Sequence, residues 1–156
     1  MRRFSMAIFI ALSMAVMAAV PAGAASTTVQ GTGTYDKLVV KNGDAALVFK
    51  IFAPGGECEI KYISVKFRDR DGTRYEMQAG CYPGNEWASN LVRGQKIVDC
   101  PKFKLNYNAT GGVWTATIPR TCLKRLAPAV KVTESYVDDY SPSPGEVPAT
   151  KYVAQG

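Results

Sequence analysis

The residues of this chain that could do chemistry are cysteines and carboxylates, because the sequence contains no histidine. Without an imidazole the chain cannot build a Ser-His-Asp or Cys-His catalytic set, and it offers no histidine ligand to a metal. The four cysteines are not spaced as Cys-x-x-Cys, which disfavours a zinc site. No phosphate-cradling glycine loop links a strand to a helix. We therefore expect the protein not to be an enzyme.

A pair of carboxylates is still allowed as a catalytic set, since a glycoside-cleaving enzyme needs only two acids at a suitable separation. The candidates are acidic residues of predicted turns: Glu57, Glu59, Asp69, Asp71, Asp138 and Asp139. Acidic side chains are ordinary in turns, so a glycoside-cleaving enzyme is a disfavoured alternative.

A metal site is suggested by one short segment, Asp69-Arg70-Asp71-Gly72, which Glu76 follows. Alternating oxygen ligands at Asp69 and Asp71 could hold Ca²⁺. The segment lacks a third acidic ligand and the full twelve-residue spacing, and a hairpin turn explains Asp and Gly equally well. We expect no cofactor, with Ca²⁺ at these two residues as the weaker alternative.

Aromatic residues near predicted loops and edges offer a binding site. We select Tyr82, Trp87 and Tyr140, and note Tyr136 and Tyr152 in similar places. Exposed aromatic rings stack on sugar faces, and Tyr and Trp also anchor protein interfaces. The alternative for Trp87 is a place in the core. Burial of both Tyr82 and Trp87 would remove this binding hypothesis.

The first 24 residues have the features of a secretory signal peptide. Arg2 and Arg3 precede an apolar run from residue 6 to 20, and small residues follow it. The triplet Ala22-Gly23-Ala24 predicts cleavage after Ala24, with Ala25 as the neighbouring alternative. The apolar run is shorter than the roughly 20 residues of a membrane-spanning helix. We expect a secreted, extracellular protein without a transmembrane anchor.

Charge gives little support for a nucleic-acid partner. Loss of Arg2 and Arg3 with the signal peptide lowers the basic residues from 19 to 17, against 13 acidic ones, so the net charge falls from +6 to +4. The remaining basic residues are scattered, apart from Lys124-Arg125 and the turn with Arg68, Arg70 and Arg74. Such groups are typical of a solvated surface, and we expect no nucleic-acid partner.

Export predicts that the four cysteines form disulfides, because the compartment outside the cell membrane is oxidising. Cys58, Cys81, Cys100 and Cys122 allow three pairings. We favour Cys58–Cys81 with Cys100–Cys122, because each bridge then brackets one or two consecutive predicted strands.

The elements that would position these residues are short strands separated by turns. Alternating apolar residues and Asn-Gly, Asp-Gly and Gly-Gly turns recur along the chain. We predict strands at 35–41, 45–53, 60–67, 73–79, 86–92, 95–99, 103–107, 113–118 and 129–137. The apolar segment 45–53 is predicted to be buried on both faces. One helical turn is expected within 119–126, a loop over 138–148 and an edge pair at 152–153.

Eight or nine short strands without a long amphipathic helix predict an all-β fold, a two-sheet antiparallel β-sandwich with two disulfides. A closed barrel is the alternative. Residues 1–24 are assigned to the signal peptide, 25–34 to a flexible leader and 35–156 to the β-sandwich domain.

Short segments of the second half resemble small exported β-sandwich proteins of actinobacteria, a functionally uncharacterised group. The matching segments are Asp99-Cys100-Pro101, Ile118 to Leu123 and the closing Tyr152 to Gly156. The resemblance supports the Cys100–Cys122 bridge. It also implies a general shape similar to extracellular ligand-binding sandwiches, which by itself says little about function.

The sequence therefore favours a secreted, non-catalytic binding or structural domain. Its unidentified partner would be an extracellular ligand, polysaccharide or protein, associated with the cell envelope or with carbohydrate. A secreted protease inhibitor is the second hypothesis, because a disulfide-supported loop such as Gly80–Glu86 could be presented to a protease.

Overall fold

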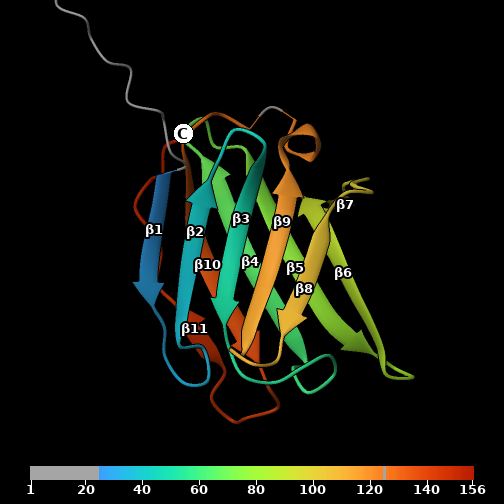
Figure 1. The fold of residues 1–156 in the computed structure, drawn as a ribbon. Helices are drawn as coiled ribbons and strands as arrows, with labels where there is room; N and C mark the ends of the chain where they lie inside the picture. The colour runs from blue at the N-terminus through green and yellow to red at the C-terminus, as the bar shows by residue number, and fades with distance from the viewer. Residues whose placement is uncertain (1–24, 125) are drawn as a thin grey trace, which may run out of the picture.

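The fold is a sandwich of two antiparallel β-sheets, seen in a computed structural model that describes residues 25–124 and 126–156 (Figure 1). The five-stranded sheet has the order β1-β2-β3-β9-β8, and the six-stranded sheet has the order β11-β10-β4-β5-β6-β7. The strands are β1 (Ala25–Gln30), β2 (Lys37–Asn42), β3 (Ala46–Phe52), β4 (Tyr62–Asp69), β5 (Arg74–Tyr82), β6 (Glu86–Arg93), β7 (Lys96–Ile97), β8 (Lys104–Asn108), β9 (Val113–Pro119), β10 (Val130–Asp138) and β11 (Gly145–Val147). This confirms the predicted two-sheet architecture.

The core lies between the sheets and is built from every second residue of the strands. Leu47, Phe49 and Ile51 of β3 are fully buried, whereas the residues between them are only half-buried. The expectation that segment 45–53 is buried on both faces is therefore wrong. A sandwich has two layers, so each sheet leaves one face to solvent.

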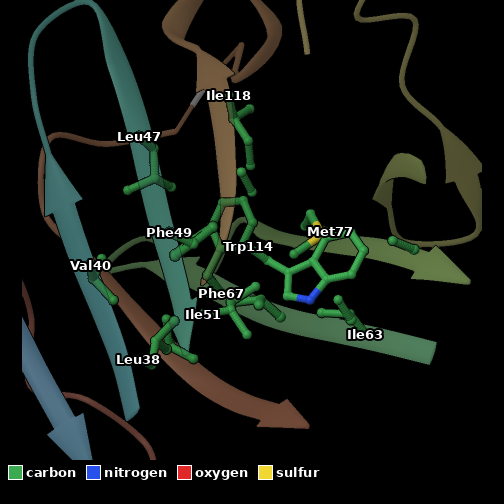
Figure 2. Packing of buried hydrophobic residues seen from close by; sticks show 14 of the residues in the cluster. Leu38, Val40, Leu47, Phe49, Ile51, Ile63, Phe67, Met77, Trp114 and Ile118 are labelled. Atoms are coloured by element: carbon green, nitrogen blue, oxygen red, sulfur yellow. The ribbon is translucent and has the colours of Figure 1, made fainter. Parts of the chain in front are cut away.

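Side chains from the two sheets meet in the middle of the sandwich. Figure 2 shows Leu47 and Phe49 of the five-stranded sheet facing Phe67 and Met77 of the six-stranded sheet. The rings of Phe49 and Phe67 have their centroids 5.2 Å apart. Trp114 of β9 is fully buried in the same cluster. Contacts of this density fix how the two sheets are placed relative to each other.

Both predicted disulfides are present. Cys58–Cys81 joins the segment after β3 to the end of β5, with a Cα–Cα distance of 5.0 Å. Cys100–Cys122 joins the connection between β7 and β8 to the 3-10 helix η1 (Arg120–Cys122), with a Cα–Cα distance of 5.4 Å. Each bridge closes a loop of little more than 20 residues, which stabilises the folded state by about 3 kcal/mol.

The predicted boundary of the domain is wrong at its N-terminal end. Residues 25–30, expected to belong to a flexible leader, form β1, and Ala25 pairs with Asn42 of β2. The polar sequence of β1 carries little hydrophobic signal; its pairing with β2 and the packing of Val29 against the core decide its structure. Likewise β11 lies inside the predicted loop 138–148 and pairs with β10.

The C-terminal segment is fastened to the beginning of the sandwich. Buried Asn42 donates hydrogen bonds to the carbonyl oxygens of Pro128 and Val153, each at 2.8 Å. The Gly156 N–H donates to the Asn42 carbonyl oxygen, and Val153 pairs with Val130. The predicted signal peptide, 1–24, lies outside the described residues. Within the part that the structure describes, no helix is long and apolar enough to cross a membrane.

Candidate functional site

A pair of tyrosines lies on the outer face of the six-stranded sheet. Tyr62 is in β4 and Tyr136 is in the neighbouring strand β10. Their sequence neighbours Ile63 and Val137 are fully buried in the core, so alternation turns both tyrosines outward. The ring centroids are 5.5 Å apart and the rings are tilted by 42°. This places two half-buried aromatic rings side by side on a strand surface.

Small residues continue the surface beside Tyr62. In the sheet register Gly80 of β5 is opposite Tyr62, and Ala88 of β6 is opposite Gly80. A Cβ atom at Gly80 would come within 3.1 Å of both the Tyr62 ring and the Lys61 carbonyl oxygen. Glycine at this position therefore lets the Tyr62 ring lie close over β5, and the surface next to the rings stays low.

The next row across the sheet is polar and uncharged. Ser64, Gln78 and Asn90 follow one another on β4, β5 and β6 in register, and Tyr136 lies on the other side of Ser64. The Ser64 hydroxyl donates a hydrogen bond of 2.7 Å to the Glu76 carboxylate. The Gln78 amide lies one strand from Tyr62 and the Asn90 amide two strands from it, and both offer donors and acceptors.

Two of the three aromatic residues selected from the sequence border this surface. Tyr82 ends β5, on the same face as Gly80, and is 51% exposed. Tyr140 follows β10 and is 63% exposed, with a left-handed backbone at φ 66°. The Lys61 ammonium lies 5.9 Å from the Tyr140 ring centroid and 3.3 Å from the Asp138 carboxylate. We call Tyr62, Tyr82, Tyr136 and Tyr140 the tyrosine face.

The third selected aromatic residue, Trp87, is not part of this face. It stacks on Trp114 with a centroid distance of 4.9 Å and packs against the core. Tyr107 contacts Trp114 at 4.7 Å. Because Trp87 is opposite Cys81 in register, it points inward where Tyr82 points outward. Trp87 is thus partly buried against the core and does not join the tyrosine face.

The predicted calcium ligands have different environments. Asp69 is fully buried, and its two carboxylate oxygens accept hydrogen bonds of 2.8 Å from the Thr73 and Ala127 N–H groups. Asp71 lies in the exposed turn between β4 and β5. Among the described residues no three acidic or cysteine side chains gather to form a metal site. The geometry gives Asp69 a role in fastening this turn to the segment before β10.

Tyr62 and Tyr136, the central pair of the site, are neutral donors at ordinary pH. Burial, with the nearby Glu76 carboxylate as the next cause, raises the pKa of Tyr62 to about 12. Burial also raises the pKa of Tyr136, and Asp138 acts in the same direction. Neutral phenol groups suit hydrogen bonds to uncharged hydroxyl groups.

Three of the carboxylates considered for a glycosidase pair, Glu59, Asp138 and Asp139, have local partners. A hydrogen bond with Ser141 lowers the pKa of Asp139, whereas a general acid needs a raised pKa. Asp138 forms an ion pair with Lys61, and Glu59 accepts a hydrogen bond from the Gly56 N–H at 2.7 Å. These contacts give the three acids local structural roles.

Sequence reasoning missed Tyr62, and it noted Tyr136 without selecting it as a site residue. The signal for Tyr62 is the alternation of β4, which places Tyr62, Ser64 and Lys66 on one face. That β10 pairs with β4, and so brings Tyr136 beside Tyr62, follows from a long-range pairing that periodicity does not contain.

Comparison with known proteins gave no match for this chain to a family model, a curated protein or a solved structure. The resemblance to exported actinobacterial proteins therefore stays a prediction, and the functional argument depends on the geometry of the site.

Proposed function

We propose that this protein is a secreted, non-catalytic domain that binds extracellular or cell-envelope carbohydrate on the tyrosine face. The observation that carries the proposal is the Tyr62–Tyr136 ring pair, 5.5 Å apart on the open face of a sheet. Secretion is inferred from the predicted signal peptide and fits the two disulfides.

Carbohydrate fits the chemistry of the face better than a general apolar ligand does. Tyrosine rings supply an apolar surface with a polar hydroxyl, which suits sugars, whose rings have apolar C–H faces and polar edges. Gln78 and Asn90 place amide groups in the adjoining row, and such groups orient polar ligands. The open sheet face also accommodates a polymer that continues past the binding site.

Protease inhibition, the alternative from the sequence, has less support from the fold. The segment 80–86 is the tip of the β5–β6 hairpin, with only Pro83, Gly84 and Asn85 between the strands. The Asn85 N–H donates a hydrogen bond to the Tyr82 carbonyl oxygen at 3.1 Å. A tight turn presents few residues in the extended form that a protease cleft binds, whereas exposed Tyr82 can contact a ligand on the tyrosine face.

Binding to a panel of soluble and insoluble polysaccharides tests the proposal, with the mature chain compared with Tyr62→Ala/Tyr136→Ala. We expect retention by at least one polysaccharide and at least tenfold weaker binding by the variant. Truncation of a central aromatic anchor to alanine typically costs about 1–2 kcal/mol or more of binding free energy. Phe52→Ala is the matched control, because Phe52 is a half-buried aromatic residue of β3, in the other sheet. Retention by no polysaccharide, or equal loss in the control, would contradict the proposal.

A further inference from the structure

Three basic side chains stand in a row across the same outer face, at the other end of β4. Lys131 of β10 is opposite Arg68 of β4, and Arg68 is opposite Arg74 of β5. Like charges directly opposite each other in a sheet destabilise it. The ion pairs within the described residues are Lys61–Asp138 and Lys66–Glu134, so none of these three cations has a carboxylate partner there. We call Lys131, Arg68 and Arg74 the basic row.

The surface is hollowed next to the basic row. A depression of about 530 Å³ is lined by Arg68 and Arg74 together with Lys66, Glu76, Val92, Gly94, Thr133 and Glu134. At Gly94 no atom lies within 4 Å of the place where a Cβ would be, so this side of the hollow is open. Long charged side chains from β4, β5 and β10 thus lie beside Val92 of β6 and Gly94 of the turn that follows β6.

Arg68 has an unused donor at this place. Its Nε atom is buried and has no hydrogen-bond partner in the described structure. A buried donor without a partner costs free energy, and guanidinium groups bind carboxylate or phosphate through paired N–H donors. An anion in the hollow would provide the missing countercharge and could accept hydrogen bonds from the guanidinium groups of Arg68 and Arg74.

The two acids that line the hollow are already engaged. Glu134 pairs with the Lys66 ammonium at 2.7 Å, and Glu76 accepts the hydrogen bond of 2.7 Å from Ser64. Their presence favours a ligand with isolated negative groups over a densely charged polyanion such as nucleic acid, which both carboxylates would repel.

Tyr152 brings an aromatic ring with two nearby cations to the edge of the row. The Tyr152 ring has Arg70 5.4 Å and Lys131 5.5 Å from its centroid. The Tyr152 hydroxyl donates a hydrogen bond of 3.3 Å to the Asp69 carbonyl oxygen. The C-terminal segment therefore holds an aromatic ring close to two cations, one of which is Lys131 of the basic row.

We infer that the basic row and its hollow bind the carboxylate or phosphate groups of an acidic polysaccharide whose sugar rings lie along the tyrosine face. Tyr62 and Arg68 are both on the outer side of β4, six residues apart, which is about 20 Å along the strand. That length accommodates several linked sugar rings. The inference rests on the proposed carbohydrate-binding function and specifies its ligand class.

The decisive comparison uses one polymer in two forms: polygalacturonate and the same polymer after reduction of its carboxyl groups. A teichoic acid with phosphodiester groups and a double-stranded DNA are measured beside them. We expect the mature protein to bind the acidic form at least tenfold more tightly than the reduced form. Binding should weaken when ionic strength rises from about 0.05 to about 0.5 M, because salt screens exposed charges.

Variants test whether the basic row causes the preference for the acidic polymer. Arg68→Gln/Arg74→Gln should lose at least tenfold in affinity for the acidic polymer while its melting temperature stays equal or rises, because like-charge repulsion is relieved. Lys41→Gln/Lys104→Gln removes the same charge from exposed positions of the five-stranded sheet and should change affinity little. Arg68→Lys/Arg74→Lys retains the charge and should still lose affinity, because an ammonium group cannot make the paired contacts of a guanidinium group.

The outcomes separate the inference from the function on which it rests. Equal binding of the acidic and reduced polymers, lost only in Tyr62→Ala/Tyr136→Ala, would overturn the inference and leave the proposed function standing. Retention of neither polymer and of no teichoic acid would overturn the inference, and the absence of binding across the full polysaccharide panel would overturn both. Preferential binding of DNA through the basic row would refute an acidic polysaccharide as the ligand. Binding of teichoic acid that is lost both in Arg68→Gln/Arg74→Gln and in Tyr62→Ala/Tyr136→Ala would support the inference and identify phosphate as the preferred group, whereas its loss in the arginine variant alone would overturn the role of the tyrosine face.

Discussion

Replacement of Asp69 by alanine would remove the carboxylate that connects the β4–β5 turn to the segment before β10. Each carboxylate oxygen accepts one backbone N–H, from Thr73 and from Ala127, at 2.8 Å. Asp69 is fully buried, so water cannot take over as acceptor without a local rearrangement. The cost of the substitution therefore includes two buried donors that lose their partner.

The magnitude follows from these two bonds. Hydrogen bonds to a charged group contribute about 1.5–3 kcal/mol each, so Asp69→Ala should lower the free energy of unfolding by about 3–6 kcal/mol. A small domain is stable by about 5–15 kcal/mol in total. At about 4 °C per kcal/mol for a domain of this size, the melting temperature should fall by roughly 12–24 °C.

The assay is thermal and urea unfolding of the oxidised protein, followed by circular dichroism. Asp71→Asn is the matched control, because Asp71 is exposed in the same turn and should change stability by less than about 0.5 kcal/mol. Calcium and a chelator should leave the melting temperature of the wild type unchanged. A loss below about 1 kcal/mol in Asp69→Ala, or a calcium-dependent stability that this substitution abolishes, would refute the structural role assigned to Asp69.

Two further predictions concern the aromatic residues. Trp87→Ala should lower the free energy of unfolding by about 2–4 kcal/mol through loss of the stack on Trp114, yet leave carbohydrate affinity within about twofold. Urea unfolding measures the stability and a binding isotherm measures the affinity. A large loss of affinity at normal stability would place Trp87 in the site. Tyr62 has a pKa raised from 10.0 to about 12. Its contribution to stability is therefore complete below pH 10 and lost as pH rises from about 10 to 12, because the unfolded phenol loses its proton first. Alkaline unfolding of Tyr62→Phe should be less steep over this interval than that of the wild type, and identical profiles would contradict the assignment.

Several elements were predictable because their signal is local. Alternation in β4, β5 and β9 identifies inward Ile63, Met77 and Trp114 without any knowledge of partners. The even cysteine count, with the pairs bracketing consecutive strands, led to both disulfides. The strands β1 and β11 escaped prediction because short, polar sequences become strands only where a neighbouring strand offers free backbone groups.

The candidate site also combines features that the sequence shows locally with features that depend on the fold. The tyrosines and the absence of histidine belong to the sequence, and the expectation of binding rather than catalysis is drawn from them; the basic residues are interpreted there only as a solvated surface. Trp87 and Tyr82 are near neighbours in the chain, but their exposure depends on the face that each strand position presents. The sandwich buries Trp87 against Trp114 and leaves Tyr82 on the surface.

The chemical character and the strand pattern of this protein are thus determined by the sequence itself, because they depend on residue type and on a period of two residues. The two surfaces that carry the functional argument were decided by the tertiary structure alone. Tyr136 comes beside Tyr62, and Lys131 beside Arg68, because β10 pairs with β4 across more than 60 residues of chain. Pairing over such a separation is selected by the packing of the whole sandwich, and no local pattern encodes it.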